Sequence, residues 1–193
     1  MGEFVLVTGA ARSGKSSFAE KLAASLGSHV AYIATAQAFD QEMEDRIKLH
    51  RSRRPASWLT IEEPLAVPEI LMKYRDSASV ILLDCVTLWL SNLLMRELGA
   101  DGEPAEDCQH RILSRVQDLA EAACLGQATL ICVSNEVGWG LVPENKLGRL
   151  YRDLAGKANQ VLAGEAGRVY LVVAGYPIEI KAAGSRILTG LED

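Results

Sequence analysis

Gly9-Ala-Ala-Arg-Ser-Gly-Lys-Ser16 is the stretch that decides the fold, and it directly follows the apolar run Phe4-Val-Leu-Val-Thr8. It fits the pattern G-x-x-x-x-G-K-[ST], in which backbone N–H groups and the start of a helix surround phosphate oxygens. In this pattern Lys15 binds the β- and γ-phosphates and Ser16 is a ligand of Mg²⁺. Residues 16–26 then carry apolar side chains at helical spacing. Strand, loop and helix therefore come in the order that a phosphate-binding P-loop requires.

A second motif ends on a carboxylate. Val80-Ile-Leu-Leu-Asp84 is continuously apolar before its last residue, which is typical of a parallel strand buried on both faces. Asp84 then lies at the carboxyl edge of the sheet, where it can hold Mg²⁺ directly or through water. Taken alone, an acidic residue at a strand end is as often a solvated terminus. Together with the P-loop it favours a metal site.

Strand-like and helix-like patterns alternate along the whole chain. This alternation predicts an α/β fold of the P-loop, RecA-like type, with a mostly parallel sheet and helices on both faces. An antiparallel edge hairpin turned at residues 175–177 is expected at the C-terminus. The length suits one core, so we expect a single domain over residues 1–193. The expected strands cover residues 4–8, 29–35, 58–61, 80–84, 128–134, 168–174 and 178–180.

Composition and charge exclude several functional classes. The net charge of −5 argues against a broad nucleic-acid surface, which needs clustered Lys and Arg. The four cysteines lack C-x-x-C spacing, so neither a zinc site nor a disulfide framework is indicated. We find no signal-peptide pattern and no apolar run long enough for a bilayer. The expected setting is the cytoplasm, without a membrane span.

His50 opens the local basic cluster His50-Arg-Ser-Arg-Arg54. It falls at helical spacing with apolar residues, and a lone histidine on such a face more often packs than reacts. The neighbouring arginines, however, would hold a polyphosphate and favour an unprotonated, nucleophilic ring nitrogen. Both interpretations remain open at this point. His29 and His110 are expected to be structural or solvated.

The segment Ser134–Asn145 also has two interpretations. It carries glycines and polar groups just past an expected strand, the place where ligands bind in open α/β sheets. A plain loop that caps the next helix is equally favoured.

Together these segments resemble the family of bifunctional adenosylcobinamide kinases and adenosylcobinamide-phosphate guanylyltransferases of adenosylcobalamin biosynthesis. The likeness covers nearly the whole chain. The resemblance implies phosphorylation of a hydroxyl on the aminopropanol arm of adenosylcobinamide by ATP or GTP. Transfer of GMP from GTP to that phosphate, giving adenosylcobinamide-GDP, is the implied second step. The matching stretches are TGAARSGKS (8–16), YIATAQ (32–37), D-x-E-M-x-x-R-I-x-x-H-R (40–51), RRPASW (53–58), LLDCVTLWLSNLL (82–94), VSNEVGWGLVPEN (133–145), RDLAGKANQ (152–160) and VVAGYPIEIK (172–181).

The resemblance also implies residue roles and an assembly. It makes His50 the carrier of the guanylyl group, with Lys15 as the second catalytic residue, and it implies a homotrimer. Only the P-loop, the arginines and Asp84 follow independently from the chemistry of the residues. The implied nucleotide and Mg²⁺ contacts are Gly9, Ala10, Ala11, Arg12, Ser13, Gly14, Lys15, Ser16, Ala34, Thr35, Ala36, Arg51, Ser52, Arg53, Arg54, Glu62 and Asp84, with Ser16 and Asp84 on the metal.

Two alternatives fit the P-loop without the second reaction. One is a kinase of another small metabolite, in which His50 only packs or binds substrate. The other is a non-catalytic, nucleotide-responsive module that opens and closes a partner surface. A GMP adduct on the protein after treatment with GTP would distinguish the first alternative from the bifunctional enzyme.

Overall fold

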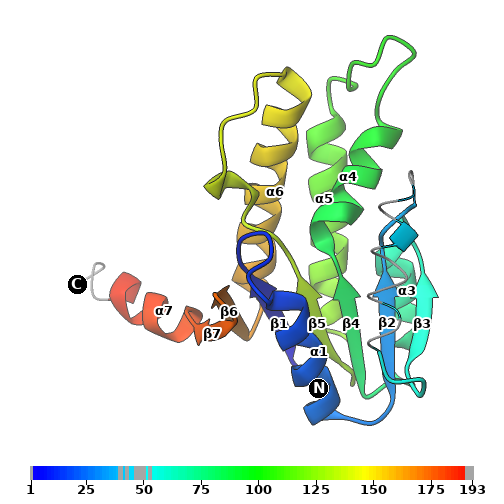
Figure 1. Ribbon diagram of the computed structural model, residues 1–193, viewed down its shortest axis with the longest axis vertical. Coiled ribbons are helices and arrows are strands. Elements are labelled where there is room, and N and C mark those ends of the chain that lie inside the picture. The colour runs from blue at the N-terminus through cyan, green and yellow to red at the C-terminus, as the bar shows by residue number, and fades with distance from the viewer. Residues whose placement is uncertain (1, 39–40, 42–43, 46–50, 52–53, 190–193) are drawn as a thin grey trace.

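The computed structural model describes residues 2–38, 41, 44–45, 51 and 54–189, and within them the chain forms one seven-stranded sheet (Figure 1). The strand order is β3-β2-β4-β5-β1-β6-β7, and every neighbouring pair is parallel except β6 and β7. The predicted α/β class, with an antiparallel pair at the C-terminal edge, is confirmed. The strands are β1 (Phe4–Thr8), β2 (Val30–Ala34), β3 (Leu59–Glu62), β4 (Val80–Asp84), β5 (Thr129–Val133), β6 (Arg168–Val173) and β7 (Tyr176–Glu179).

Helices cover both faces of the sheet, as predicted. Alternate strand residues such as Val5 and Leu82 pack under α1, while Leu6 and Ile81 belong to the core on the other face. Figure 1 shows α1 crossing one face, with α5 and α6 behind the sheet. None of the helices in the described part of the chain has the length and apolarity needed to span a bilayer. The helices are α1 (Lys15–Leu26), α3 (Val67–Tyr74), α4 (Val86–Arg96), α5 (Cys108–Ala123), α6 (Lys146–Glu165) and α7 (Lys181–Thr189), with a 3₁₀ turn at Val137–Trp139.

The order of the central strands creates room at one edge of the sheet. Strand β5 lies between β1 and β4, so the P-loop strand and the Asp84 strand are not neighbours. In register, Val7 stands beside Val133, which stands beside Asp84. Two strand spacings, about 10 Å, therefore separate the end of β1 from the end of β4. The P-loop and Asp84 therefore reach the same edge of the sheet from two strands that flank β5.

The C-terminal hairpin differs from the sequence prediction. The prediction placed the turn at residues 175–177, but positive φ angles mark Ala174 and Gly175 as the turn, and Pro177 lies inside β7 opposite Val172. Proline is tolerated there because β7 is an edge strand. Helix α7 was not predicted. Its first residue, Lys181, donates hydrogen bonds to the carbonyls of residues 163, 164 and 166 at the end of α6.

Gly9, the first residue of the P-loop, has a backbone that other residues adopt only under strain. Its φ is 154°, and an added Cβ would lie 2.5 Å from the Val172 carbonyl oxygen and 2.8 Å from Ser13 Oγ. The loop thus closes tightly against β6, and only glycine fits.

Gly9→Ala is expected to lower the free energy of unfolding by about 2 kcal/mol, because the new methyl group meets a backbone oxygen and the φ is strained. Urea denaturation measures the change. The control is Gly156→Ala, since Gly156 is exposed in α6 with nothing within 4 Å of an added Cβ. That variant should gain about 0.5–1 kcal/mol from helix propensity. Equal stability of Gly9→Ala and the wild type would contradict the tight closure.

Candidate functional site

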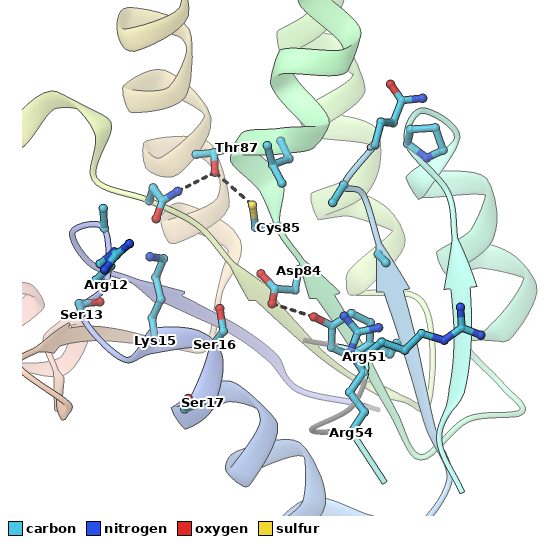
Figure 2. Close-up of a pocket in the computed structure, with 18 of the residues that line it drawn as sticks. Arg12, Ser13, Lys15, Ser16, Ser17, Arg51, Arg54, Asp84, Cys85 and Thr87 are labelled. Carbon is cyan, nitrogen blue, oxygen red and sulfur yellow. Dashed lines mark hydrogen bonds between the residues drawn. The ribbon is translucent and has the colours of Figure 1, made fainter. Parts of the chain in front are cut away.

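A cleft of about 1260 Å³ opens at the carboxyl ends of the central strands (Figure 2). It is larger than a typical small-molecule pocket, so it has room for a nucleotide and part of a second substrate. The structure brings together residues from the P-loop, the ends of β2, β3 and β4, and the basic cluster. The predicted site residues that line the cleft are Ala11, Arg12, Ser13, Gly14, Lys15, Ser16, Ala34, Ala36, Arg51, Arg54, Glu62 and Asp84.

Six other predicted residues do not appear in this lining. Gly9 and Ala10 accept backbone hydrogen bonds from Glu136 and Ser13, and Thr35 is fully buried. His50, Ser52 and Arg53, together with most of the helix expected between Asp40 and His50, lie outside the described residues. Their roles stay predictions.

Lys15 is held close to its own loop. Its Nζ donates a hydrogen bond to the Ala10 carbonyl at 3.2 Å, and the residue is only 9% exposed. Burial lowers the pKa of Lys15, while the charge of the nearby Asp84 acts in the opposite direction. Figure 2 shows Lys15 and Ser16 rising from the loop on the side of the cleft that faces Asp84. A cation in such a low-dielectric place interacts strongly with a bound phosphate.

Asp84 is held by a tyrosine from the neighbouring strand. Tyr32 of β2 donates a hydrogen bond from its hydroxyl to Asp84 Oδ2 at 2.7 Å, which is the dashed line at Asp84 in Figure 2. Burial, with the Asp84 charge as a second cause, raises the pKa of Tyr32 well above its ordinary value. The hydroxyl is therefore protonated at neutral pH and can donate to the carboxylate.

The described part of the basic cluster reaches the cleft through two arginines. The Arg54 guanidinium carbon lies 3.5 Å from the centre of the Tyr32 ring, and Trp58 stacks near the same ring. Arg51 forms an exposed ion pair with Glu62 at 3.4 Å. In water such a pair contributes little stability, so Arg51 is available to exchange Glu62 for a phosphate.

Thr35 has its hydroxyl engaged inside the protein. It donates to the Cys85 carbonyl at 2.8 Å and accepts from the Cys85 N–H at 2.9 Å, while Asn92 donates to the Thr35 carbonyl. These bonds tie the end of β2 to the start of α4. Burial raises the pKa of the Cys85 thiol to about 11, so the thiol is neutral and part of this packing.

Sequence reasoning missed a polar group on the opposite wall. Thr87 Oγ1 accepts a hydrogen bond from Asn135 Nδ2 at 3.1 Å, and Tyr151 donates from its hydroxyl to the Thr87 carbonyl at 3.0 Å. All three residues line the cleft. The only signal in the sequence was the open interpretation of Ser134–Asn145. Tyr151 had none, because it reaches the cleft from the second turn of α6.

The segment Ser134–Asn145 has features of both interpretations. Asn135 lines the cleft, and the next residue, Glu136, accepts hydrogen bonds from Thr8 of β1 and from Asn159 of α6. At the far end, Asn145 accepts a hydrogen bond from the Gly148 N–H and so caps α6. Its start therefore belongs to the cleft and its end is a helix cap.

The residues of the cleft suit Mg²⁺. Mg²⁺ takes oxygen ligands and usually keeps one or two protein ligands, with water and phosphate oxygens completing the octahedron. Ser16 and Asp84 both line the cleft and offer a hydroxyl and a carboxylate. Among the residues that the structure describes, no group of three or more His, Cys, Asp or Glu could hold a metal by itself.

Comparisons with known proteins agree over nearly the whole chain. The family model described as cobinamide kinase / cobinamide phosphate guanyltransferase matches residues 5–180. The chain is 47% identical over 178 residues to the bifunctional adenosylcobalamin biosynthesis protein CobP of Pseudomonas aeruginosa, covering 91% of this chain and 96% of that protein. It is 43% identical over 181 residues to the bifunctional adenosylcobalamin biosynthesis protein CobU of Escherichia coli, covering 92% and 99%. Among solved structures, the RadB recombinase aligns with a TM-score of 0.49 and 14% identity, covering 88% of this chain and 74% of that one.

Proposed function

The chain belongs to the cobinamide kinase / cobinamide phosphate guanyltransferase family, and from this membership we propose that the one cleft of Figure 2 serves both reactions. The protein is a bifunctional kinase and guanylyltransferase of adenosylcobalamin biosynthesis. The observation that supports a shared cleft is that Lys15, Asp84 and Arg54 line the same cavity. A nucleotide bound at one site can then be attacked either at its γ-phosphorus, in the kinase step, or at its α-phosphorus, in the guanylyl step.

In the kinase step, ATP or GTP lies with its β- and γ-phosphates in the P-loop. The loop amides and Lys15 hold these oxygens, and the hydroxyl of the aminopropanol arm attacks the γ-phosphorus. An O–P bond forms to the corrinoid, the bond to the nucleoside diphosphate breaks, and the hydroxyl proton leaves to solvent. Catalysis in this step is mainly alignment and charge stabilisation.

Mg²⁺ would be held by Ser16 and Asp84, with the nucleotide phosphates completing its ligands. When bound there, it neutralises the negative charge of the phosphate oxygens. The contribution of the chain is to fix the two oxygen ligands on separate elements, Ser16 on α1 and Asp84 at the end of β4.

In the guanylyl step, a ring nitrogen of His50 attacks the α-phosphorus of GTP and expels pyrophosphate. The new N–P bond is then broken when a phosphate oxygen of adenosylcobinamide phosphate attacks the same phosphorus. Arg51, Arg53 and Arg54 neutralise charge on the phosphorus as it passes between the two partners. Two steps replace one encounter between two anionic groups, and Arg51 and Arg54 line the cleft as this role requires.

The products of the purified protein test this function directly. With adenosylcobinamide, ATP, GTP and Mg²⁺, mass spectrometry of the corrinoids should show the phosphate first and the GDP derivative later. Accumulation of the phosphate alone would favour a kinase without the guanylyl step. Tight GTP binding with neither product would favour a nucleotide-responsive module.

Asp84→Asn is expected to lower kcat of the kinase step about 100-fold, because the variant loses the carboxylate charge opposite the phosphates. The measurement is corrinoid phosphorylation as a function of Mg²⁺ concentration. Asp118→Asn is the control, since Asp118 is an exposed residue of α5 paired with Arg115. Full kinase activity in Asp84→Asn at ordinary Mg²⁺ would rule out the metal role.

We also propose a homotrimer in the cytoplasm, with residues 1–193 as one P-loop domain. An exposed apolar surface on the C-terminal hairpin supports association: Val173, Tyr176 and Ile178 are 47%, 77% and 56% exposed. Light scattering of the eluting protein measures the mass, and a monomer at micromolar concentration would contradict the assembly.

A further inference from the structure

Tyr32 lines the cleft between Asp84 and Arg54 and contacts both. It stands opposite Leu82 in the pairing of β2 with β4, and Ala34 stands opposite Asp84. Because side chains alternate along a strand, Tyr32, Leu82 and Asp84 point to the same face of the sheet. Tyr32 can therefore reach forward by two residues to the carboxylate, and it does so with only 1% of its own surface exposed.

The hydroxyl of Tyr32 fixes how the Asp84 carboxylate stands. It donates to Oδ2 at 2.7 Å, and in the described part of the chain it is the one group that donates to this carboxylate. With one oxygen held, rotation of the carboxylate is restricted and the second oxygen keeps one direction. Hydrogen bonds of this kind to a metal-binding carboxylate typically change metal affinity 10–100-fold.

The ring of Tyr32 stacks against the guanidinium of Arg54. The guanidinium carbon lies 3.5 Å from the ring centre, which is close stacking, and Trp58 supports the ring at 6.4 Å between centroids. Arg54 Nε is buried, and within the described residues it has no hydrogen-bond partner. The face of the Tyr32 ring is a close contact of this guanidinium among the described residues. Arg54 is also the last residue of the basic cluster that begins at His50.

We propose that Tyr32 is a positioning residue for both reactions, in which the hydroxyl orients Asp84 for the metal and the ring holds Arg54, the end of the His50–Arg54 cluster, over the cleft. This inference rests on the proposed roles of Asp84 and of the cluster. It adds that the two roles depend on different atoms of one side chain. They can therefore be separated by substitution.

Tyr32→Phe removes the hydroxyl and keeps the ring. Binding of Mn²⁺ in the presence of GTP, measured by electron paramagnetic resonance, should weaken about tenfold. The amount of GMP attached covalently to the protein at saturating Mg²⁺ should change less than about twofold, because the ring that Arg54 stacks on is still present. Arg54→Met should give the opposite pattern, with unchanged Mn²⁺ affinity and GMP adduct formation slowed about tenfold.

Tyr170→Phe is the matched control. Tyr170 also has an arginine near its ring, with the Arg168 guanidinium carbon 5.9 Å from the centroid, and its hydroxyl accepts a hydrogen bond from Arg168. It lies on β6, outside the cleft lining. This variant should leave both readouts unchanged, and thermal denaturation of all three variants verifies folding.

Unchanged Mn²⁺ affinity in folded Tyr32→Phe overturns the role of the hydroxyl. Equal loss of both readouts in Tyr32→Phe and Arg54→Met overturns the separation of the two roles. Failure of the guanylyl mechanism gives a different result, because the wild type itself would then form no GMP adduct. In that case the comparison of Mn²⁺ affinities still decides the role of the hydroxyl.

Discussion

His50→Asn is expected to abolish transfer of GMP while leaving phosphorylation of adenosylcobinamide within about threefold of the wild type. The reason is chemical: asparagine has a similar reach and polarity but no nucleophilic nitrogen, so no N–P bond can form. The kinase step uses the P-loop and Asp84, which the substitution does not touch. The two corrinoid products, quantified separately by chromatography, measure the two activities in one reaction.

His110→Asn is the control for this variant, because His110 is exposed on α5 and lies outside the cleft lining. It should retain both products. Simultaneous loss of both activities in a folded His50→Asn protein would refute the division of labour between the cluster and the P-loop. Retained transfer of GMP would remove His50 from the mechanism.

Lys15→Ala is expected to reduce both activities at least about 100-fold. Lys15 lies in the P-loop and is nearly buried, so water screens the attraction between its charge and a bound phosphate only weakly. The substitution removes this attraction. Both reactions use a nucleotide whose polyphosphate is bound in that loop, so the rates of both should fall together. Initial rates with saturating nucleotide, together with nucleotide affinity from calorimetry, separate loss of binding from loss of chemistry.

Lys21→Ala is the control on the same helix, because Lys21 is exposed on α1 and lies outside the lining of the cleft. It should change neither rate. If Lys15→Ala lost only one of the two activities, the two reactions would use different polyphosphate sites and the shared cleft would be wrong.

The parts of the site that follow from local sequence could be predicted. The P-loop is one continuous stretch, and Asp84 ends a continuous apolar strand, so both were visible without any knowledge of neighbours. The contact between Tyr32 and Asp84 was not, because it depends on β2 lying beside β4. The group around Thr87 combines α4, the segment just after β5 and the second turn of α6, which no spacing rule connects.

In the fold, too, local features could be predicted from the sequence and long-range arrangements could not. Alternating patterns predicted the parallel sheet and its antiparallel edge, but they did not show that β5 would separate β1 from β4. The hairpin turn was misplaced because Pro177 was taken as part of the turn, whereas an edge strand accommodates it. Helix α7 starts with a lysine that binds the carbonyl end of α6, a long-range contact that gives no periodic signal.

GMP should pass through His50 in the same cleft that holds the P-loop. Mass spectrometry of the intact protein after incubation with Mg²⁺ and GTP, followed by peptide mapping under mildly alkaline conditions that preserve an N–P bond, tests it most directly. We expect one GMP adduct per chain, located on His50 and lost in acid. Protein that binds GTP but remains unmodified, or an adduct on another residue, would contradict it.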